Sequence, residues 1–164
     1  MNNGLTFDFD VVINREKTAC VTGHRSLPSD LDVKVLKEYF IKLIEEKGYD
    51  TFLIGMAVGF DTLCFNILEK IRKKKDIKII ACLPCLNQDA YFSPEQKKEY
   101  KRMLNSADKK ILLQERYDRY CMLKRNEFMV DNSSKVLALK RKDEGGTAYT
   151  VRYANKKNVT VVAF

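Results

Sequence analysis

The sequence predicts an α/β fold in three layers, with a mostly parallel sheet covered by helices on both faces. Segments with strand character alternate with segments of helical periodicity from residue 17 to the C-terminus. Several strands are continuous apolar runs, such as residues 136–139, and such runs are typical of parallel strands buried on both faces. Short glycine-containing turns follow several of these strands. This regular alternation indicates the layered architecture.

Six strands and five helices are expected, and they alternate along the chain, beginning and ending with a strand. The first strand ends at Gly23, and the helix after it begins with Ser29 as its N-cap and stops at Gly48. Another helix begins at Pro94, since proline suits the first helical position. The expected strands are residues 18–22, 52–54, 77–83, 111–113, 135–139 and 159–164. The expected helices are residues 30–47, 60–71, 94–107, 120–132 and 147–155.

A chain of 164 residues, 45% of them hydrophobic, is long enough to form one domain with its own core. We expect this single domain to comprise residues 17–164. Residues 1–16 do not share the alternation of strand and helix. Phe7, Phe9 and Val11 alternate with polar positions there, so the segment 1–16 is expected to form an N-terminal arm or an added edge strand.

Composition excludes several classes of protein. No apolar run approaches the roughly 18 residues of a membrane span, and residues 1–4 lack the features of a signal peptide. We therefore expect a cytoplasmic protein with no membrane partner, whose five cysteines are reduced thiols. The net charge of +8 comes from short basic clusters that we interpret as a solvated surface. No nucleic-acid-binding signature accompanies them, so nucleic acid is not the expected partner.

The strands are expected to end at a common rim that carries the candidate ligand-binding residues. In open α/β sheets, ligands bind beyond the carboxyl ends of the strands. Three turns between a strand and a helix contain glycines and polar side chains, and a helix start attracts anions through its unpaired N–H groups. This pattern predicts a small molecule that carries phosphate. The candidate residues are Thr22, Gly23, His24, Arg25, Gly55, Gly59, Asp61, Gln88, Arg125, Asn126, Gly145, Gly146 and Thr147.

Some of these residues have a second, purely structural interpretation. His24 either contacts the ligand or holds a loop by a hydrogen bond, and Arg25 either binds a phosphate or forms a surface ion pair. Asp61 either caps its helix or accepts hydrogen bonds from ribose hydroxyls. Tyr91 and Phe92 either stack on a base or cover the edge of the core.

Two other kinds of site are not expected. The segment 82–85 reads Cys-Leu-Pro-Cys, which is similar to a thioredoxin motif, but no helix begins directly after it. We interpret these cysteines as core or loop residues. His24 is the single histidine of the chain, and no cysteine pair has the spacing of zinc ligands, so no metal site is expected.

A series of motifs extends from about residue 17 to the C-terminus. The motifs are Thr22-Gly23-His24-Arg25, the turn with Gly59 and Asp61, Leu83-Pro84 with Gln88, Arg125-Asn126 with Met129-Val130-Asp131, and Gly145-Gly146-Thr147 with Val151 and Tyr153-Ala154. In this order they resemble the SLOG superfamily, a Rossmann-like group that contains the DNA-processing protein DprA and the LOG phosphoribohydrolases. The chain is most similar to the small YpsA-like branch of this group. The resemblance implies one Rossmann-like domain, residues 17–164, that binds a nucleotide or a nucleotide-derived ligand.

One departure from the LOG enzymes leaves catalysis open. Their glycine-rich motif continues to a glutamate that, with an arginine resembling Arg125, serves in cleaving the N-glycosidic bond of a nucleotide. This chain has Thr150 at the position of that glutamate, and a threonine hydroxyl does not replace a carboxylate at neutral pH. Glu144 and Asp61 are the candidate catalytic carboxylates that remain.

Three functional hypotheses follow from these residues. The first is binding of a mononucleotide or an NAD- or ADP-ribose-type ligand, for sensing or sequestration, with no further cofactor expected. The second is hydrolysis of a nucleotide N-glycosidic or phosphoester bond. The third, which only the basic charge and the resemblance favour, is DprA-like binding of single-stranded DNA. A homodimer through Tyr117, Tyr120 and Met122 is a further expectation that the resemblance implies.

Overall fold

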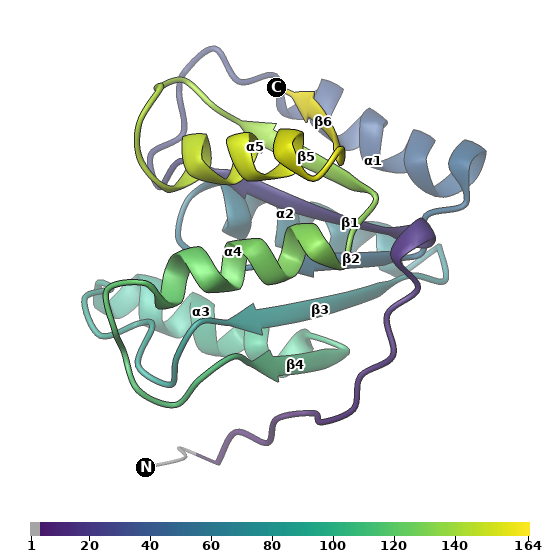
Figure 1. Ribbon diagram of the computed structural model, residues 1–164. Helices are drawn as coiled ribbons and strands as arrows, with labels where there is room; N and C mark the ends of the chain where they lie inside the picture. Colours follow the sequence, from purple (N-terminus) through teal and green to yellow (C-terminus); the bar gives the residue numbers. More distant parts are fainter. Residues whose placement is uncertain (1–3) are drawn as a thin grey trace.

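The computed structural model describes residues 4–164 and contains one six-stranded sheet with helices on both sides (Figure 1). All five strand pairs are parallel, and the strand order is β4-β3-β2-β1-β5-β6. The strands are β1 (Thr18–Gly23), β2 (Thr51–Ile54), β3 (Lys78–Leu83), β4 (Lys109–Leu112), β5 (Lys135–Leu139) and β6 (Thr160–Ala163). The helices are α1 (Val33–Lys47), α2 (Phe60–Arg72), α3 (Pro94–Ser106), α4 (Cys121–Asp131), α5 (Gly146–Lys156) and the short 3-10 helix η1 (Arg15–Lys17). The predicted three-layer α/β fold is confirmed.

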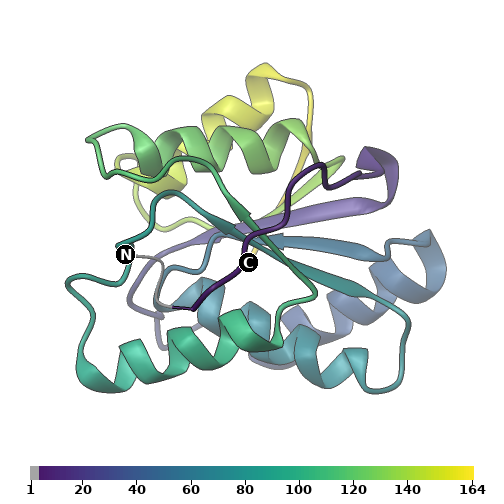
Figure 2. The ribbon, with the colours of Figure 1, turned by 90° about the horizontal axis from the view of Figure 1, so that it is seen from below.

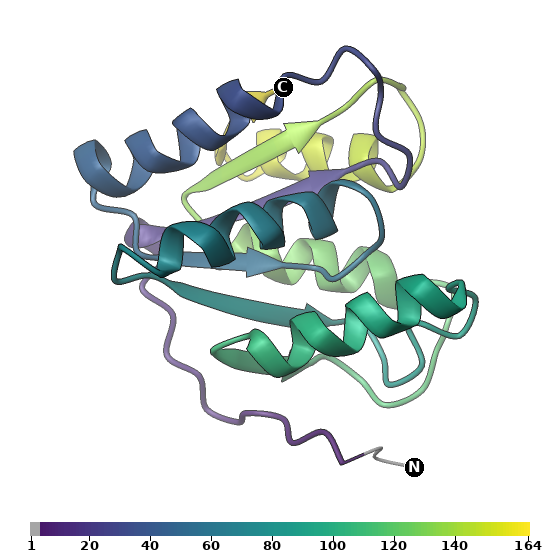
Figure 3. The same cartoon turned by 180° about the vertical axis from the view of Figure 1, so that it is seen from behind.

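The helices form two separate layers, which Figure 2 shows above and below the sheet. α4 and α5 cover the face seen in Figure 1, and α1, α2 and α3 cover the face seen in Figure 3. Successive residues of a strand therefore enter different cores: Ala19 and Val21 belong to the cluster under α1–α3, and Cys20 belongs to the cluster under α4 and α5. Each strand begins with a threonine or a lysine, and because both faces are covered, most of the strand residues after it are apolar.

The strand order changes direction between β1 and β5. The chain moves outward from β1 through β2 and β3 to β4, and then returns to the other side of β1 to form β5 and β6. Crossovers between parallel strands are right-handed, so α1 and α5, which follow β1 and β5, lie on opposite faces. Their two connecting loops separate at the carboxyl edge of the sheet and leave a crevice there.

The start of α1 differs from the prediction. Asp32, rather than Ser29, is the N-cap, and its Oδ1 accepts hydrogen bonds from the N–H groups of Lys34 (3.0 Å) and Val35 (3.1 Å). The residues before it form a turn in which the N–H of Leu31 donates to the carbonyl of Pro28 (3.2 Å). The prediction was wrong because this turn delays the helix until the next capping side chain. The other predicted ends of strands and helices differ from the observed ones by no more than two residues.

The N-terminal segment lies beside the outer edge of β4 and contains no strand within residues 4–14. Asp8 makes the main contact: its N–H donates to the carbonyl of Lys110 (2.8 Å), and its carboxylate accepts from the N–H of Lys110 (2.8 Å). Phe7 packs on the core under α1–α3, whereas Phe9 is 88% exposed. The alternation of Phe7 and Phe9 therefore does not place both on the core. Residues 1–3 of the predicted segment lie outside the described part of the chain.

We predict that Gly59→Ala destabilises the protein more than Gly48→Ala does. Both glycines have positive φ angles, +84° and +74°, so each substitution carries a backbone cost, about 1–2 kcal/mol at a left-handed position such as Gly48. A Cβ at Gly59 would also lie 2.2 Å from the carbonyl oxygen of Arg25, whereas a Cβ at Gly48 meets nothing within 4 Å. Gly59→Ala should therefore cost about 3 kcal/mol or more in urea denaturation. Equal losses for the two variants would contradict this packing argument.

Candidate functional site

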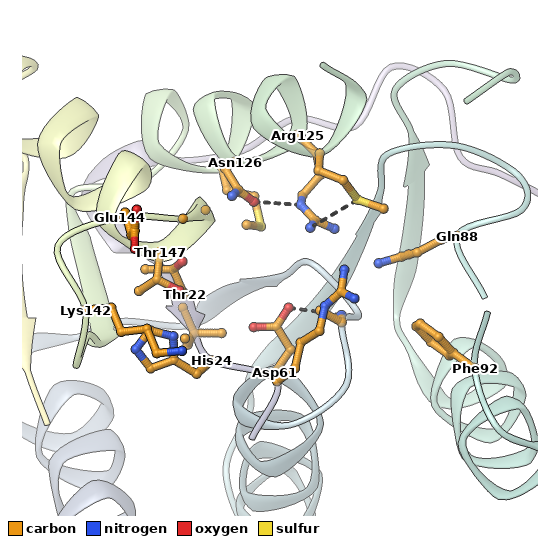
Figure 4. Close-up of a pocket in the computed structure, with 18 residues that line it drawn as sticks. Thr22, His24, Asp61, Gln88, Phe92, Arg125, Asn126, Lys142, Glu144 and Thr147 are labelled. Carbon is orange, nitrogen blue, oxygen red and sulfur yellow. Dashed lines mark hydrogen bonds between the residues drawn. The ribbon is translucent and has the colours of Figure 1, made fainter. Parts of the chain in front are cut away.

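A cavity of about 320 Å³, here called the rim cavity, opens at the carboxyl edge of the sheet beside β1 and β5 (Figure 4). Its volume is within the range of ligand pockets. Eleven of the thirteen predicted ligand-binding residues line it. They are Thr22, Gly23, His24 and Arg25 after β1, Asp61 in α2, Gln88 after β3, Arg125 and Asn126 in α4, and Gly145, Gly146 and Thr147 at the start of α5. The parallel sheet thus brings together residues from distant parts of the chain.

The two remaining predicted residues, Gly55 and Gly59, do not line the cavity but lie directly against residues that do. A Cβ at Gly55 would lie 2.7 Å from Cζ of Arg125. A Cβ at Gly59 would collide with the backbone of the loop that carries His24 and Arg25. Both glycines therefore let other residues of the site come close, which is a supporting role.

The start of α5 presents backbone N–H groups to the cavity. Its N-cap is Gly145, and no side chain among residues 4–164 caps the helix. Gly146 and Thr147 follow at the first positions and line the cavity. Since the first N–H groups of a helix have no partner within it, this end offers donors and a partial positive charge. Thr150 does not take part, because it is buried and its hydroxyl donates to the carbonyl of Gly146 (2.8 Å).

Arg125 forms the wall of the cavity on the α4 side, and its side chain is only 5% exposed. Its Nη1 donates to the carbonyls of Gly55 and Cys82, the latter at 3.3 Å. Its Nε donates to Oδ1 of Asn126 (2.8 Å), and its Nη2 faces the sulfur of Met122 at 3.9 Å. Burial lowers the pKa of Arg125 and the charge of Asp61 opposes this effect. Most donors of the guanidinium therefore bind the protein itself, and Nη2 is the part left for a ligand.

Asp61 lies across the cavity from Arg125, at the start of α2 (Figure 4). Its Oδ2 accepts a hydrogen bond from the N–H of Ala57 (3.1 Å), so the carboxylate holds the loop before its own helix. The side chain is buried, and burial raises the pKa of Asp61 to about 6, against the opposing effects of Arg125 and of the Ala57 N–H. A cavity carboxyl that titrates near neutral pH is typical of functional sites.

His24 joins the two loops on either side of the crevice. Its Nε2 accepts a hydrogen bond from the N–H of Arg141 (2.7 Å), which connects the loop after β1 to the loop after β5. Partial burial lowers the pKa of His24, and the charges of Lys142, Arg141 and Lys140 lower it further. The imidazole is therefore neutral at neutral pH, as an acceptor at Nε2 requires. The structural interpretation of His24 is observed, and ligand contact stays a prediction.

Arg25 and Lys142 supply cations that the fold does not use. Both line the rim cavity, and neither side chain forms an ion pair or hydrogen bond within the described residues. Gln88 differs from them, since its Nε2 donates to the carbonyl of Gly55 (2.8 Å) and its Oε1 accepts from the hydroxyl of Tyr100 (3.2 Å). Gln88 and Asn126 therefore position the cavity wall, whereas Arg25 and Lys142 remain available to an anion.

Sequence reasoning missed several lining residues. Lys142 belongs to the cluster Lys140-Arg141-Lys142, one of the basic clusters that we interpret from the sequence as a solvated surface. Its place three residues before Gly145 is a signal that it lies near the start of α5. The candidate catalytic residue Glu144 lies in the same exposed loop and also lines the cavity. Phe92, which the sequence analysis names as a ring that stacks on a base or covers the edge of the core, also lines the cavity. The remaining lining residues have no polar side chain to mark them in the sequence. They are Val21, Ala57, Met122 and Met129.

All five cysteines are buried free thiols in the described structure. Burial raises the pKa of Cys82 to about 12 and the pKa of Cys85 to about 11. A catalytic cysteine needs a lowered pKa to form the thiolate, so the segment 82–85 does not have the chemistry of a thioredoxin motif. Within residues 4–164, no three His, Cys, Asp or Glu side chains come together as metal ligands. No helix in this part of the chain has the length and apolar character to cross a bilayer.

The raised pKa of Asp61 predicts that stability falls as the pH rises through about 4 to 6. In this window the native state keeps a proton that the unfolded chain releases near 3.8, so the native state loses stability as the pH rises. Since one pKa unit corresponds to about 1.4 kcal/mol, the loss due to Asp61 is about 3 kcal/mol. In urea denaturation, the free energy of unfolding of Asp61→Asn relative to that of the native protein should therefore rise by about 3 kcal/mol between about pH 4 and about pH 7.5. A difference that is constant with pH would contradict the buried carboxyl.

Solved structures of DprA proteins share this fold. The DprA structure from Streptococcus pneumoniae has a TM-score of 0.66 at 17% identity and covers 89% of this chain. The DprA structure from Helicobacter pylori, whose single-stranded DNA binding mode is described, has a TM-score of 0.62 at 18% identity and covers 91% of this chain. The chain spans 49% of the length of the pneumococcal chain and 65% of that of the Helicobacter chain. At these identities the likeness is one of fold.

Sequence comparisons identify the family. The SPbeta prophage-derived protein YoqJ of Bacillus subtilis (strain 168) is 36% identical, over 74% of this chain and 81% of its own length. The family model named YpsA, described as the YspA SLOG family, matches residues 29–161. The match includes the cavity-lining residues from Ala57 to Thr147, but not the lining residues 21–25 of β1 and of the loop after it. The predicted resemblance is confirmed, and the chain belongs to the YpsA SLOG family.

Proposed function

We propose that the protein binds a nucleotide or a nucleotide-derived ligand, of the mononucleotide, NAD or ADP-ribose type, in the rim cavity for sensing or sequestration. The observation that carries the proposal is the uncapped start of α5, which lines the cavity at Gly145, Gly146 and Thr147. Backbone N–H groups at a helix start form an anion site, and glycines let a phosphate approach them closely.

The charges around the cavity suit a ligand with an anionic part and hydroxyl groups. Arg25 and Lys142 have no partner among residues 4–164 and lie where a phosphate would gain from them. Asp61 and Glu144 line the same cavity and are hydrogen-bond acceptors for ribose hydroxyls. Since the pKa of Asp61 is raised to about 6, its repulsion of an anion weakens as the pH falls toward that value.

We predict that Gly146→Asp abolishes ligand binding without destabilising the fold. An aspartate at the helix start interacts favourably with the dipole, by about 0.3–1 kcal/mol, and a Cβ at Gly146 meets nothing within 4 Å. The same carboxylate repels a phosphate. At a concentration of 100 times Kd, AMP, NAD or ADP-ribose should stabilise the native protein by about 2.7 kcal/mol. Thermal denaturation should therefore show a higher melting temperature for the native protein with ligand, and no change in the melting temperature of Gly146→Asp.

Gly146→Asn is the matched control, because it adds a side chain of the same shape without the charge. This variant should keep most of the ligand-induced shift. If neither variant affects the shift, the ligand does not bind at α5. If no nucleotide in the panel shifts the melting curve of the native protein, the proposed function is wrong.

A second candidate function is hydrolysis of a nucleotide N-glycosidic or phosphoester bond. The observation that favours it is Asp61, a buried cavity carboxyl whose pKa of about 6 suits a general acid or base. Glu144 lies on an exposed loop at the same cavity and is the other candidate carboxylate. Release of free base or of inorganic phosphate from AMP, followed by chromatography and lost in Asp61→Asn, would establish this activity.

Binding of single-stranded DNA is the alternative that the DprA-like fold and the charge of +8 favour. DNA binding through basic residues weakens steeply with salt concentration.

We predict that Arg25→Ala weakens nucleotide binding about tenfold or more, as the loss of a charge-assisted contact does. The matched control Arg116→Ala, an exposed arginine outside the cavity, should have no effect. Salt-sensitive retention of an oligothymidylate, equally weakened by both variants, would instead indicate a diffuse DNA-binding surface.

A homodimer is also proposed rather than observed. Tyr117 and Tyr120 are exposed, as a contact surface requires, but Met122 lines the rim cavity. Analytical ultracentrifugation of the native protein and of Tyr120→Glu tests whether this face joins two copies.

A further inference from the structure

A second cavity, of about 400 Å³, adjoins the rim cavity on the side of β3 and β4. The two cavities share Arg25, Gln88, Phe92 and Met122 as lining residues. The second cavity also includes Tyr91 and Tyr117, so we call it the aromatic cavity. Because the cavities share part of their walls, a single ligand of sufficient length reaches both.

Three aromatic rings line the aromatic cavity: Phe92, which packs against the core, and Tyr91 and Tyr117, which are exposed. Phe92 packs edge-on against the buried ring of Tyr100, with centroids 5.6 Å apart. Tyr91 is fully exposed, and Tyr117 is 62% exposed. Single exposed aromatic residues are common on protein surfaces, but here two exposed rings from different loops line one cavity. Rings of this kind stack on nucleobases without regard to sequence.

Amide side chains complete the aromatic cavity. Asn87 and Gln96 line it, and both are exposed. The Oε1 of Gln96 accepts from the N–H of Ser93 (2.9 Å) as part of the N-cap of α3, which holds the side chain in place and leaves its NH₂ group available. Amide groups beside stacking rings provide the donors and acceptors that the edge of a base requires. The rim cavity, in contrast, contains the cations and the helix start.

Although the two cavities adjoin, the start of α5 and the loop with Tyr91 lie far enough apart to hold different parts of a ligand. The start of α5 follows β5, whereas the loop with Tyr91 and Phe92 follows β3, which is three strands away in the sheet. Neighbouring strands are about 4.8 Å apart, so about 14 Å separate the two strand ends. Arg25 contributes to both cavities and lies on the path between them. A phosphate at α5 therefore places the remainder of the ligand toward the aromatic cavity.

Resting on the proposed function, we propose that the nucleobase of the ligand binds in the aromatic cavity, against Tyr91 and Tyr117, while its phosphate lies at the start of α5. The aromatic cavity thus determines that the ligand contains a base, and the rim cavity determines that it is an anion. A sugar phosphate without a base occupies only the rim cavity.

The test compares ligands with and without a base. Isothermal titration calorimetry measures binding of AMP, ADP-ribose and ribose 5-phosphate to the full chain and to the double variant Tyr91→Ala/Tyr117→Ala. Both tyrosines are exposed, so their replacement leaves the core intact. The double variant should bind the tighter of AMP and ADP-ribose about tenfold to a hundredfold more weakly, as loss of stacking does, and should bind ribose 5-phosphate as the native protein does. Tyr120 is an exposed tyrosine of the same loop as Tyr117 and lies outside both cavities. The matched control Tyr120→Ala should therefore bind all three ligands as the native protein does.

Each other outcome separates the inference from the proposed function. If the native protein binds AMP or ADP-ribose and the double variant binds them equally well, the base lies elsewhere and the inference is overturned. The same conclusion follows if ribose 5-phosphate binds as tightly as the nucleotides. If none of the three probes binds the native protein, the proposed function itself fails. If an oligothymidylate binds, its binding is lost in the double variant and the three probes do not compete, the cavity belongs to single-stranded DNA and the inference is overturned.

Discussion

The buried guanidinium of Arg125 is the contact on which the candidate site depends. It joins α4 to the carboxyl ends of β2 and β3 through the carbonyls of Gly55 and Cys82. A buried charge is tolerated only when it is paired or hydrogen-bonded. The two carbonyls accept from Nη1, and Oδ1 of Asn126 accepts from Nε. Gly55 makes the contact possible, since any Cβ there would lie 2.7 Å from Cζ of Arg125. The wall of the rim cavity therefore depends on both residues: Arg125 donates to the carbonyl of Gly55, and the missing side chain of Gly55 leaves room for the guanidinium.

This network divides the polar residues of the site into two groups. Gln88 and Asn126 bind Gly55 and Arg125 and keep the wall in place. His24 performs a similar task on the other side of the crevice, where it joins two loops through Arg141. Arg25, Lys142 and the start of α5 have no such task among the described residues. Because the fold satisfies the first group internally, the second group provides the free donors and charges that an anionic ligand would meet.

Much of the fold was predictable because its rules are local. Gly48 ends α1 with a φ of +74°, and Ser93 begins α3 with a reciprocal pair of hydrogen bonds to Gln96. The start of α1 was not predictable, because Ser29 and Asp32 are both good caps and the turn at Pro28 decides between them. The alternation of Phe7 and Phe9 did not reveal whether residues 1–16 form an arm or an edge strand. The position of this segment depends on the contact of Asp8 with Lys110, which is 102 residues away in the sequence.

The amino-acid pattern alone was enough to predict the layers of the fold and the edge of the sheet at which the loops meet. Continuous apolar strands require cover on both faces, and the parallel direction of the strands puts all of their carboxyl ends at one edge of the sheet. The folded arrangement was needed to distinguish the side chains at this edge that bind the protein itself from those that have no partner among residues 4–164. Arg125 and Arg25 are the same residue type beside the same cavity, yet one is buried against two carbonyls and the other is exposed. The physical reason is that their partners come from strands and loops distant in sequence, so their hydrogen bonds exist only once the sheet has formed.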